Sequence, residues 1–403
     1  MRLLTKAAAA VRHMATQATQ ANQTHPFNLT FLGTASAVPS STRGHSSLTL
    51  RIGADVWMFD CGEGTQRQFP KSDVKLSRIT KIFLTHLHGD HVFGVVPLMA
   101  GLLNGTGGME GDGDPREAKV DVDNPSLEIY GPLGTRAYIR SNLTLTHTCL
   151  GSSYVVHELR FPRDPKTGDF TALSRNHAES PAGRNIQQTD GVWKDFVIDG
   201  NLSVSAGPIK HSVPCVGYVV AENSLPGKVD PSKYIPELKR TGTPLSAMRE
   251  LQDGKSVTLK DGTILHGPAR RRGRKVVILG DTSNPSGIEP LAQDCDLLIH
   301  EATNAHLPGV DSRTKDDETY ASVEQRTRSR GHSTPQMAGI FAKRIRAKAL
   351  ILNHFSTKYA DGSLNDGSQQ IMNAIQGLAA DAYGGPVLCA SDFMTYTLDP
   401  PPY

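Results

Sequence analysis

Several features of other protein classes are missing from this sequence. Its 403 residues are 38% hydrophobic, yet no run approaches the roughly 20 consecutive apolar residues of a membrane-spanning helix, so we expect no membrane association. The five cysteines are scattered and form no C-x-x-C pair, which argues against a disulfide scaffold and for a reducing compartment. The net charge of +3 is too small to indicate a nucleic-acid-binding protein by itself, so any contact with a polyanion must come from local patches.

Acidic residues are absent from the first 54 positions. Residues 1–26 carry Arg2, Lys6 and Arg12 among Ala, Thr, Gln and Leu, a composition typical of a mitochondrial targeting leader. A disordered tail without a targeting role is the alternative. Met14 offers a second start, from which the same gene could make a cytosolic or nuclear form. We therefore restrict the fold prediction to residues 27–403, as one domain.

Short strands and helices are predicted in both halves of this domain. Strands are indicated by β-rich, alternating or nearly continuous apolar runs at residues 28–32, 47–52, 56–60, 79–85, 275–279, 296–299 and 349–352. Helices are expected at residues 92–103, 335–346 and 369–382, with Ser333 and Thr334 as candidate caps in front of Pro335. Strands in both halves, each followed by helices, predict an α/β fold with two sheets packed face to face and helices outside.

Two stretches are predicted to be insertions. Residues 105–124 are rich in Gly and Asp and poor in apolar side chains, as in a surface loop. Residues 222–268 hold Pro, Gly, Lys and Asp with few large apolar side chains, which predicts an arm that projects from the domain. Basic clusters at residues 270–275 and 326–330 could contact phosphates. For the first cluster, a solvated turn or a nuclear-import signal is the alternative.

The clearest chemical signal is the sequence Thr-His-Leu-His-Gly-Asp-His at residues 85–91, directly after a predicted strand. His86, His88 and His91 supply three imidazoles, and Asp90 supplies a carboxylate. Only a loop can turn four such side chains toward one point, and zinc accepts these ligands in open catalytic sites. A surface loop with chance histidines is the alternative, which the density of ligands and the strand–loop–helix context disfavour.

Four residues in one loop do not complete two metal sites, so partners should lie at the ends of other strands. His211, Asp281 and His354 each stand just after an apolar run or before a turn. Taken singly, each could be a loop histidine or an aspartate that caps a turn. Together they supply the remaining ligands, and Asp281 is the natural bridge because one carboxylate has an oxygen for each cation.

At this point the sequence resembles a known family. The H-x-H-x-D-H loop is similar to the signature of metallo-β-lactamase-fold hydrolases, which implies an αββα sandwich. The finer pattern resembles tRNase Z, most of all its short eukaryotic form. The similar segments include FDCGEGTQ at residues 59–66, HSVPCVGY at 211–218, GDT at 280–282, HEAT at 300–303, GHST at 331–334 and NHFS at 353–356. The H-E-A-T and G-H-S-T motifs distinguish tRNase Z from lactamases and glyoxalases.

The resemblance implies a role for each matching residue. The first of two Zn²⁺ ions would be held by His86, His88 and His211, and the second by Asp90, His91 and His354. Asp281 would bridge them, and Asp60 would orient the metal loop. Asp90 would also take a proton from the attacking water. His332, backed by Glu301, would return a proton to the leaving 3′-hydroxyl; helix-end polar residues without a catalytic role are the alternative for this pair.

The function implied is a zinc-dependent endoribonuclease that cleaves precursor tRNA at its 3′ end, acting as a homodimer. The arm at residues 222–268 would bind the tRNA, although its expected Gly-Pro tip reads Thr-Gly-Thr-Pro at 241–244, so its grip could differ. One alternative keeps the metals but repairs damaged or cyclic-phosphate tRNA ends or hydrolyses small phosphodiesters. Another is a non-catalytic RNA-binding scaffold, which would need a broken ligand set, whereas all seven ligands are present. Manganese would also fit such a site.

Overall fold

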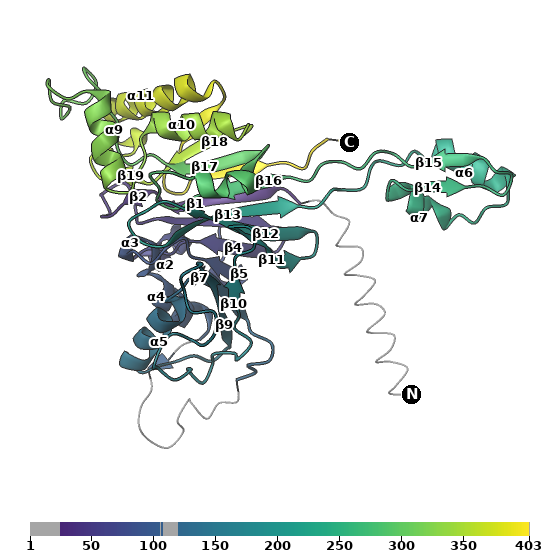
Figure 1. The fold of residues 1–403 in the computed structure, drawn as a ribbon, viewed down its shortest axis with the longest axis horizontal. Helices are drawn as coiled ribbons and strands as arrows, with labels where there is room; N and C mark the ends of the chain where they lie inside the picture. The colour runs from purple at the N-terminus through teal and green to yellow at the C-terminus, as the bar shows by residue number, and fades with distance from the viewer. Residues whose placement is uncertain (1–24, 105, 108–119, 403) are drawn as a thin grey trace.

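Two β-sheets packed face to face form the centre of the computed structural model, and helices cover the outer face of each sheet (Figure 1). The structure describes residues 25–104, 106–107 and 120–402, so the predicted leader and most of the predicted loop at residues 105–124 lie outside the described residues. The predicted αββα sandwich is confirmed. Within the described ranges, no helix is long and apolar enough to cross a membrane.

The first sheet has eight strands. In spatial order they are β10 (Asn185–Gln187), β9 (Tyr154–Arg160), β7 (Leu127–Pro132), β5 (Ile79–Phe83), β4 (Asp55–Phe59), β3 (Ser47–Ile52), β1 (Phe27–Gly33) and β21 (Thr395–Leu398). The second sheet has seven. They are β11 (Trp193–Asp199), β12 (Leu202–Ile209), β13 (Cys215–Glu222), β16 (Lys275–Ile278), β17 (Leu297–Glu301), β18 (Leu350–Asn353) and β20 (Val387–Cys389).

Three layers of apolar side chains hold the sandwich together. Between the sheets, Phe59 and Phe83 of the first sheet stack with ring centroids 5.0 Å apart, and both meet the ring of Tyr218 from the second. The outer face of the first sheet is covered by α4 (Val95–Leu102) and α5 (Thr135–Leu145). The outer face of the second is covered by α10 (Pro335–Arg344) and α11 (Asp366–Tyr383). Apolar burial on both faces explains why these strands read as nearly continuous apolar runs.

The metal-binding candidates lie where parallel strands end. Strands β4, β5 and β7 run parallel to one another, and so do β16, β17 and β18. Because the carboxyl ends of parallel strands meet at one edge, the loops that follow β5, β16 and β18 converge. The turn after β12 reaches the same place, because β12 and β16 are both antiparallel to β13. The short strands β2 (Ala35–Ser36) and β19 (Phe355–Ser356) pair beside this edge.

The predicted helix at residues 92–103 is present as α4 but begins three residues later. Helix α3 (Gly89–Val92) ends, and α4 begins at Val95. Between them, the N–H of Gly94 donates to the carbonyl of Cys61 at 2.9 Å, and a Cβ on Gly94 would lie 2.1 Å from the carbonyl oxygen of Gly62. The predicted helix is thus confirmed as α4, and this close backbone approach separates it from α3, which holds Asp90 and His91 of the predicted loop. The other predicted elements match within a few residues, and Thr334 caps α10 as predicted.

The remaining helices and strands are short and lie in loops and in the arm. They are α2 (Thr65–Gln68), α6 (Pro231–Arg240), α7 (Ala247–Gln252), α8 (Glu289–Ala292), α9 (Tyr320–Ser329), β6 (Thr106–Gly107), β8 (Thr148–Cys149), β14 (Ser256–Thr258) and β15 (Ile264–His266). Helices α6 and α7 and the hairpin β14–β15 form a unit far from the sheets, hereafter the projecting unit (Figure 1). Two extended segments, residues 223–230 and 267–274, connect it to the sheets and are hereafter the stalk. This projecting unit falls inside the predicted arm.

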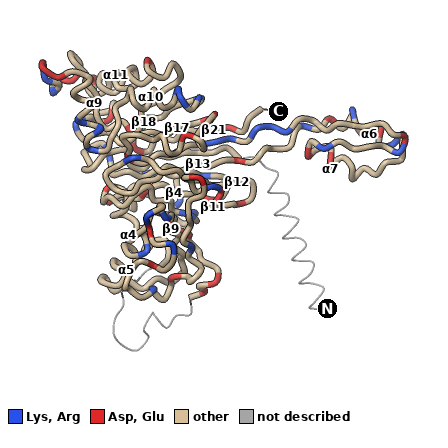
Figure 2. The backbone as a smooth tube through the Cα atoms, viewed as in Figure 1, with Lys and Arg blue, Asp and Glu red and all other residues tan. Residues whose placement is uncertain are grey.

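The projecting unit has its own apolar cluster, which the sequence analysis did not anticipate. Tyr234 and Leu238 of α6 pack with Leu251 of α7 and with Val257 and Leu259 of the hairpin. Lys and Arg positions are interspersed with Asp and Glu positions along the backbone of the unit (Figure 2). The unit is therefore a small folded body on a stalk rather than an irregular loop.

Candidate metal centre

Asp60 fixes the loop that carries the histidines. It follows β4 with a φ of 57°, and its N–H donates to the carbonyl of Phe83 at the end of β5. Its carboxylate accepts from the backbone N–H of Thr85 at 2.7 Å and from the Thr85 hydroxyl at 2.8 Å. The same carboxylate lies 2.7 Å from Nδ1 of His91. One buried aspartate thus sets both the start and the last histidine of the loop.

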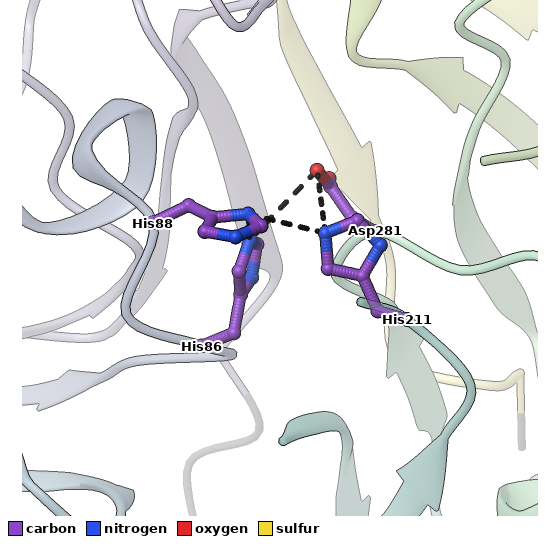
Figure 3. Close-up of side chains that lie close together, drawn as sticks. All are labelled: His86, His88, His211 and Asp281. Carbon is purple, nitrogen blue, oxygen red and sulfur yellow. Dashed lines mark hydrogen bonds and ion pairs between the residues drawn. The ribbon is translucent and has the colours of Figure 1, made fainter. Parts of the chain in front are cut away.

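The first cluster of ligand atoms comes from both sheets. His86 and His88 reach it from the loop after β5, His211 from the turn after β12, and Asp281 from the loop after β16 (Figure 3). Nδ1 of His88 lies 3.1 Å from Nε2 of His86 and 3.1 Å from Nε2 of His211. Oδ2 of Asp281 lies 3.8 Å from the Nε2 atoms of both His86 and His211.

A second cluster lies beside the first and shares Asp281 with it. Nε2 of His91 and Nε2 of His354 are 3.2 Å apart, and Nε2 of His354 is 3.3 Å from Oδ2 of Asp90. Oδ1 of Asp281 lies 3.4 Å from His91 and 3.2 Å from His354. Asp281 therefore turns one oxygen to each cluster. All seven residues predicted as ligands are brought together in these two groups.

The chemistry of these atoms fits cations. Nδ1 of His211 lies 2.9 Å from the carbonyl of Gly331, which can only accept, so Nε2 of His211 turns a lone pair inward. Nδ1 of His91 faces the carboxylate of Asp60, which also can only accept, so Nε2 of His91 likewise turns a lone pair inward. Oδ1 of Asp281 is buried without a hydrogen-bond partner among the described residues. Lone pairs that face one another need a positive charge between them, and tetrahedral zinc with bonds of ~2.0–2.1 Å sets its ligands about 3.3 Å apart.

Electrostatics keep the two carboxylates of the centre ionised. Burial alone would raise the pKa of Asp281, but the neighbouring imidazoles of His354 and His91 lower it well below its ordinary value. Burial likewise opposes ionisation of Asp90, and the neighbouring imidazoles of His354 and His91 outweigh burial and lower its pKa. Burial also lowers the pKa of His86, which favours the neutral imidazole that a metal requires.

Glu301 and His332 stand at the edge of the same centre. Oε1 of Glu301 accepts from the N–H of Thr282 at 2.8 Å and lies 3.1 Å from Nδ1 of His332, while Oε2 accepts from the Thr303 hydroxyl at 2.6 Å. Burial lowers the pKa of His332, but the charge of Glu301 outweighs it and raises the pKa to about 9. His332, His88, Asp90 and Asp281 line a pocket of about 560 Å³, hereafter the metal pocket.

The sequence analysis missed three groups that act on these residues. The N–H of Ala37 donates to Oδ2 of Asp90 at 2.8 Å from a backbone with a φ of 62°, and no side-chain pattern reveals such a contact. The carbonyl of Gly331 orients His211, which is also invisible in a motif. Thr303 touches Glu301, His332 and His354. Its place in H-E-A-T was the available signal.

The two basic clusters are largely engaged within the protein. Arg274 pairs with Glu222 at 2.9 Å, and Arg271 donates to the carbonyls of Pro226 and Pro401. These contacts fasten the base of the stalk, so the phosphate-binding role weighed for residues 270–275 receives no support. In the second cluster, Arg326 and Arg328 form ion pairs with the nearby Glu318 and Glu324 (2.7 Å each).

Comparison with known proteins places the chain in a family. The family model described as "Anti-Pycsar protein Apyc1" matches residues 27–101, which include the histidine loop. "Zinc phosphodiesterase ELAC protein 1" of Homo sapiens is 39% identical over 348 residues, covering 82% of this chain and 87% of that protein. "Ribonuclease Z" of Crocosphaera subtropica is 36% identical over 375 residues, covering 91% and 97%. The chain belongs to the ribonuclease Z family.

Solved structures agree with this membership. The crystal structure of human tRNase Z, short form (ELAC1), is 33% identical with a TM-score of 0.57, covering 92% of this chain and 98% of that one. The metallo-β-lactamase-fold protein YhfI of Bacillus subtilis has a TM-score of 0.51 at 15% identity, which supports the fold alone. The predicted resemblance to tRNase Z is confirmed, and this ribonuclease Z family member is a metal-dependent hydrolase.

Proposed function

We propose that this ribonuclease Z family member is a zinc-dependent endoribonuclease that cleaves precursor tRNA at its 3′ end and releases the 3′ trailer. The observation that carries the proposal is the position of Asp281 between two sets of inward-facing imidazoles, with His332 on the same pocket and Glu301 behind it. His86, His88 and His211 would hold one Zn²⁺, and Asp90, His91 and His354 a second. The name of the human relative, zinc phosphodiesterase, supports zinc, and the two clusters support two ions per chain.

The protein's own residues would handle the protons of the reaction. Zinc, when bound, would supply Lewis acidity toward the phosphodiester and lower the pKa of a nearby water. Asp90, held by the N–H of Ala37, would accept the proton of the attacking water. His332, with Nδ1 facing Glu301, would donate a proton from Nε2 to the departing 3′-oxygen of the tRNA body. The products would be a tRNA with a 3′-hydroxyl and a trailer with a 5′-phosphate.

Purified protein and a precursor tRNA test this proposal directly. Mapping both new ends should place the cut at the 3′ side of the tRNA body, and elemental analysis should find two equivalents of zinc. A chromogenic phosphodiester, assayed in parallel, reports the centre without RNA. Hydrolysis of the small ester with no cleavage of any precursor tRNA would refute the endoribonuclease and leave a small-molecule phosphodiesterase.

Cellular location and assembly are further parts of the proposal. The leader composition supports mitochondrial import, with a nuclear or cytosolic form from Met14. Residues 1–26 fused to a fluorescent protein should direct it to mitochondria, and a diffuse signal would remove this part. A homodimer, implied by the resemblance alone, should appear in analytical ultracentrifugation as twice the mass of the chain.

A further inference from the structure

A second hollow of about 350 Å³, hereafter the side groove, adjoins the metal pocket. His45 and Glu63 line both, so the side groove begins at the wall of the metal pocket. None of the seven proposed ligands lines it, and neither does His332. The proposed hydrolysis uses none of the side chains that line the side groove.

The side groove presents cationic side chains. Arg67 and Lys71 are both exposed on its wall. Arg67 has no ion-pair partner in the part of the chain that the structure describes, and Lys71 donates only to Oε1 of Gln68, at 3.5 Å. The acids of the groove are Glu63, at the end shared with the metal pocket, and Asp392, whose two oxygens are engaged in hydrogen bonds. The cations away from the metal pocket are therefore available to a phosphate.

Phe393 adds an exposed aromatic ring to the same groove. Its side chain is 38% exposed, and its backbone has a φ of 67°, a left-handed conformation that residues with a side chain rarely adopt. Two hydrogen bonds to β1 hold it there: the N–H of Phe393 donates to the carbonyl of Phe31, and the N–H of Phe31 donates to the carbonyl of Met394. The protein thus keeps an apolar ring in contact with solvent beside two free cations.

The walls of the side groove are already fixed to one another. Oδ1 of Asp392 accepts from the Thr34 hydroxyl at 2.7 Å, and Oδ2 accepts from the N–H of Gly44 at 2.7 Å and from Nε2 of Gln68 at 3.0 Å. One carboxylate therefore joins three segments that surround the groove. A groove formed in advance loses little freedom when a ligand enters, which favours binding.

We propose that the side groove binds the first nucleotides of the 3′ trailer as single-stranded RNA, with a base stacked on Phe393 and a phosphate beside Arg67 and Lys71. Aromatic stacking combined with cations along the backbone is how proteins bind single strands of any sequence, and trailers differ in sequence. His332, which would protonate the 3′-oxygen of the tRNA body, lines one side of the metal pocket, so the tRNA body would lie on that side. The side groove opens from another side of the pocket, which His45 and Glu63 line. This inference rests on the proposed function.

Variants of the groove separate trailer binding from catalysis. Phe393→Ala and Arg67→Ala should each lower kcat/KM on a precursor with a long trailer by on the order of tenfold, the scale of removing one base stack. A precursor with a single trailer nucleotide should be affected much less. Zinc content and hydrolysis of bis(nitrophenyl) phosphate should match wild type. Phe393→Trp should restore the long-trailer activity, because it keeps a ring for stacking.

The salt dependence of binding gives a second readout for the cation. Arg67→Ala should reduce the slope of log affinity against log salt by about 0.7 for each RNA phosphate that the enzyme no longer neutralises. Two matched control variants lie in a loop that does not line the groove: Phe170→Ala, also an exposed phenylalanine with positive φ, and Arg163→Ala, an exposed arginine. Both should cleave long-trailer precursor as wild type does.

Three results would overturn the proposal. Equal loss of affinity for mature tRNA, which has no trailer, would show that the groove holds the tRNA body. Unchanged kcat/KM and salt slope in both groove variants, with an active wild type, would show that it holds no RNA and would leave the proposed function intact. A wild-type enzyme that cleaves no precursor tRNA would remove the proposed function and the trailer site together.

Discussion

The metal centre and the projecting unit are built in opposite ways. The centre gathers buried and half-buried side chains from the segments that follow strands of both large sheets. The projecting unit has two short helices, a hairpin and one small apolar cluster, and among the described residues it is joined to the sheets through its stalk. The metal centre therefore rests on the large apolar cores of the sandwich, whereas the arm depends on a few apolar residues of its own. A mutation that disrupts the metal centre should therefore leave the projecting unit folded, and a mutation that unfolds the projecting unit should leave the metal centre intact.

Removing the bridge between the clusters should have the largest effect. Asp281→Ala leaves each set of imidazoles without its shared carboxylate, so zinc content and all hydrolysis should fall by several orders of magnitude. Asp60→Ala, which removes an orienting contact rather than a ligand, should cost on the order of 10- to 100-fold in metal affinity. Elemental analysis measures the zinc content, and the assays with precursor tRNA and with the chromogenic phosphodiester measure the hydrolysis. Two retained zincs and normal turnover in Asp281→Ala would disprove the ligand assignment.

Removing the proposed proton donor, His332, should have the second-largest effect and should slow the two substrates to different extents. His332 is not needed for the seven-ligand set, so His332→Ala should keep both zincs and bind precursor tRNA nearly normally. Its turnover on RNA should fall by about 10²–10⁴-fold. Bis(nitrophenyl) phosphate should be spared, because nitrophenolate leaves without a proton, whereas Asp90→Ala should damage both reactions. Loss of zinc, or equal slowing of both substrates, would make His332 a ligand or a structural residue.

Deleting the projecting unit should spare the centre. Replacing residues 228–268 with a short flexible linker retains Glu222, which pairs with Arg274, and the backbone pairing of Leu225 with Arg271. Cleavage of precursor tRNA should weaken by on the order of 10- to 100-fold, the loss of about 1.4–2.8 kcal/mol of binding. Hydrolysis of the small ester should continue unchanged. If both activities fell together, the segment would belong to the catalytic core.

A single substitution inside the unit should give the smallest and most local effect. Leu238 is fully buried in the cluster of the projecting unit, so Leu238→Ala should destabilise that unit by about 2–5 kcal/mol. Hydrogen exchange should accelerate in α6 and α7 while the strands of the large sheets remain protected. Leu298→Ala, at an equally buried position of β17, is the contrasting variant and should accelerate exchange throughout the second sheet. Identical exchange patterns would contradict the independence of the two regions.

The sequence predicted the centre better than its surroundings, for a physical reason. Histidine and aspartate at strand ends are rare enough to be noticed, and parallel strands bring their ends together, so His211, Asp281 and His354 could be found from position alone. The supporting contacts come from backbone groups, which every residue has. For this reason the N–H of Ala37 and the carbonyl of Gly331 could not have been predicted.

The distribution of charged residues predicted function less well than the histidine and aspartate pattern did. A run of arginines at residues 270–275 looks the same in sequence whether it faces a phosphate or a carbonyl. In the structure Arg274 also lies over the ring of Phe27, 3.7 Å from its centroid, a partner far away in the chain. The apolar cluster of the arm was missed because its members are spread among polar residues and gather only when the hairpin forms. Contacts between distant residues decide both cases, and composition does not record them.

The nitrogens of His91 and His354 are 3.2 Å apart, although 263 positions separate the two residues in the chain. A polypeptide emerging from the ribosome must therefore complete β18 and dock it before the second cluster exists. Contacts between residues so far apart in the chain slow folding, because the entropy of closing the long loop between them must be lost first. A cation can therefore bind at the second cluster only after the two halves of the chain have met in the correct register.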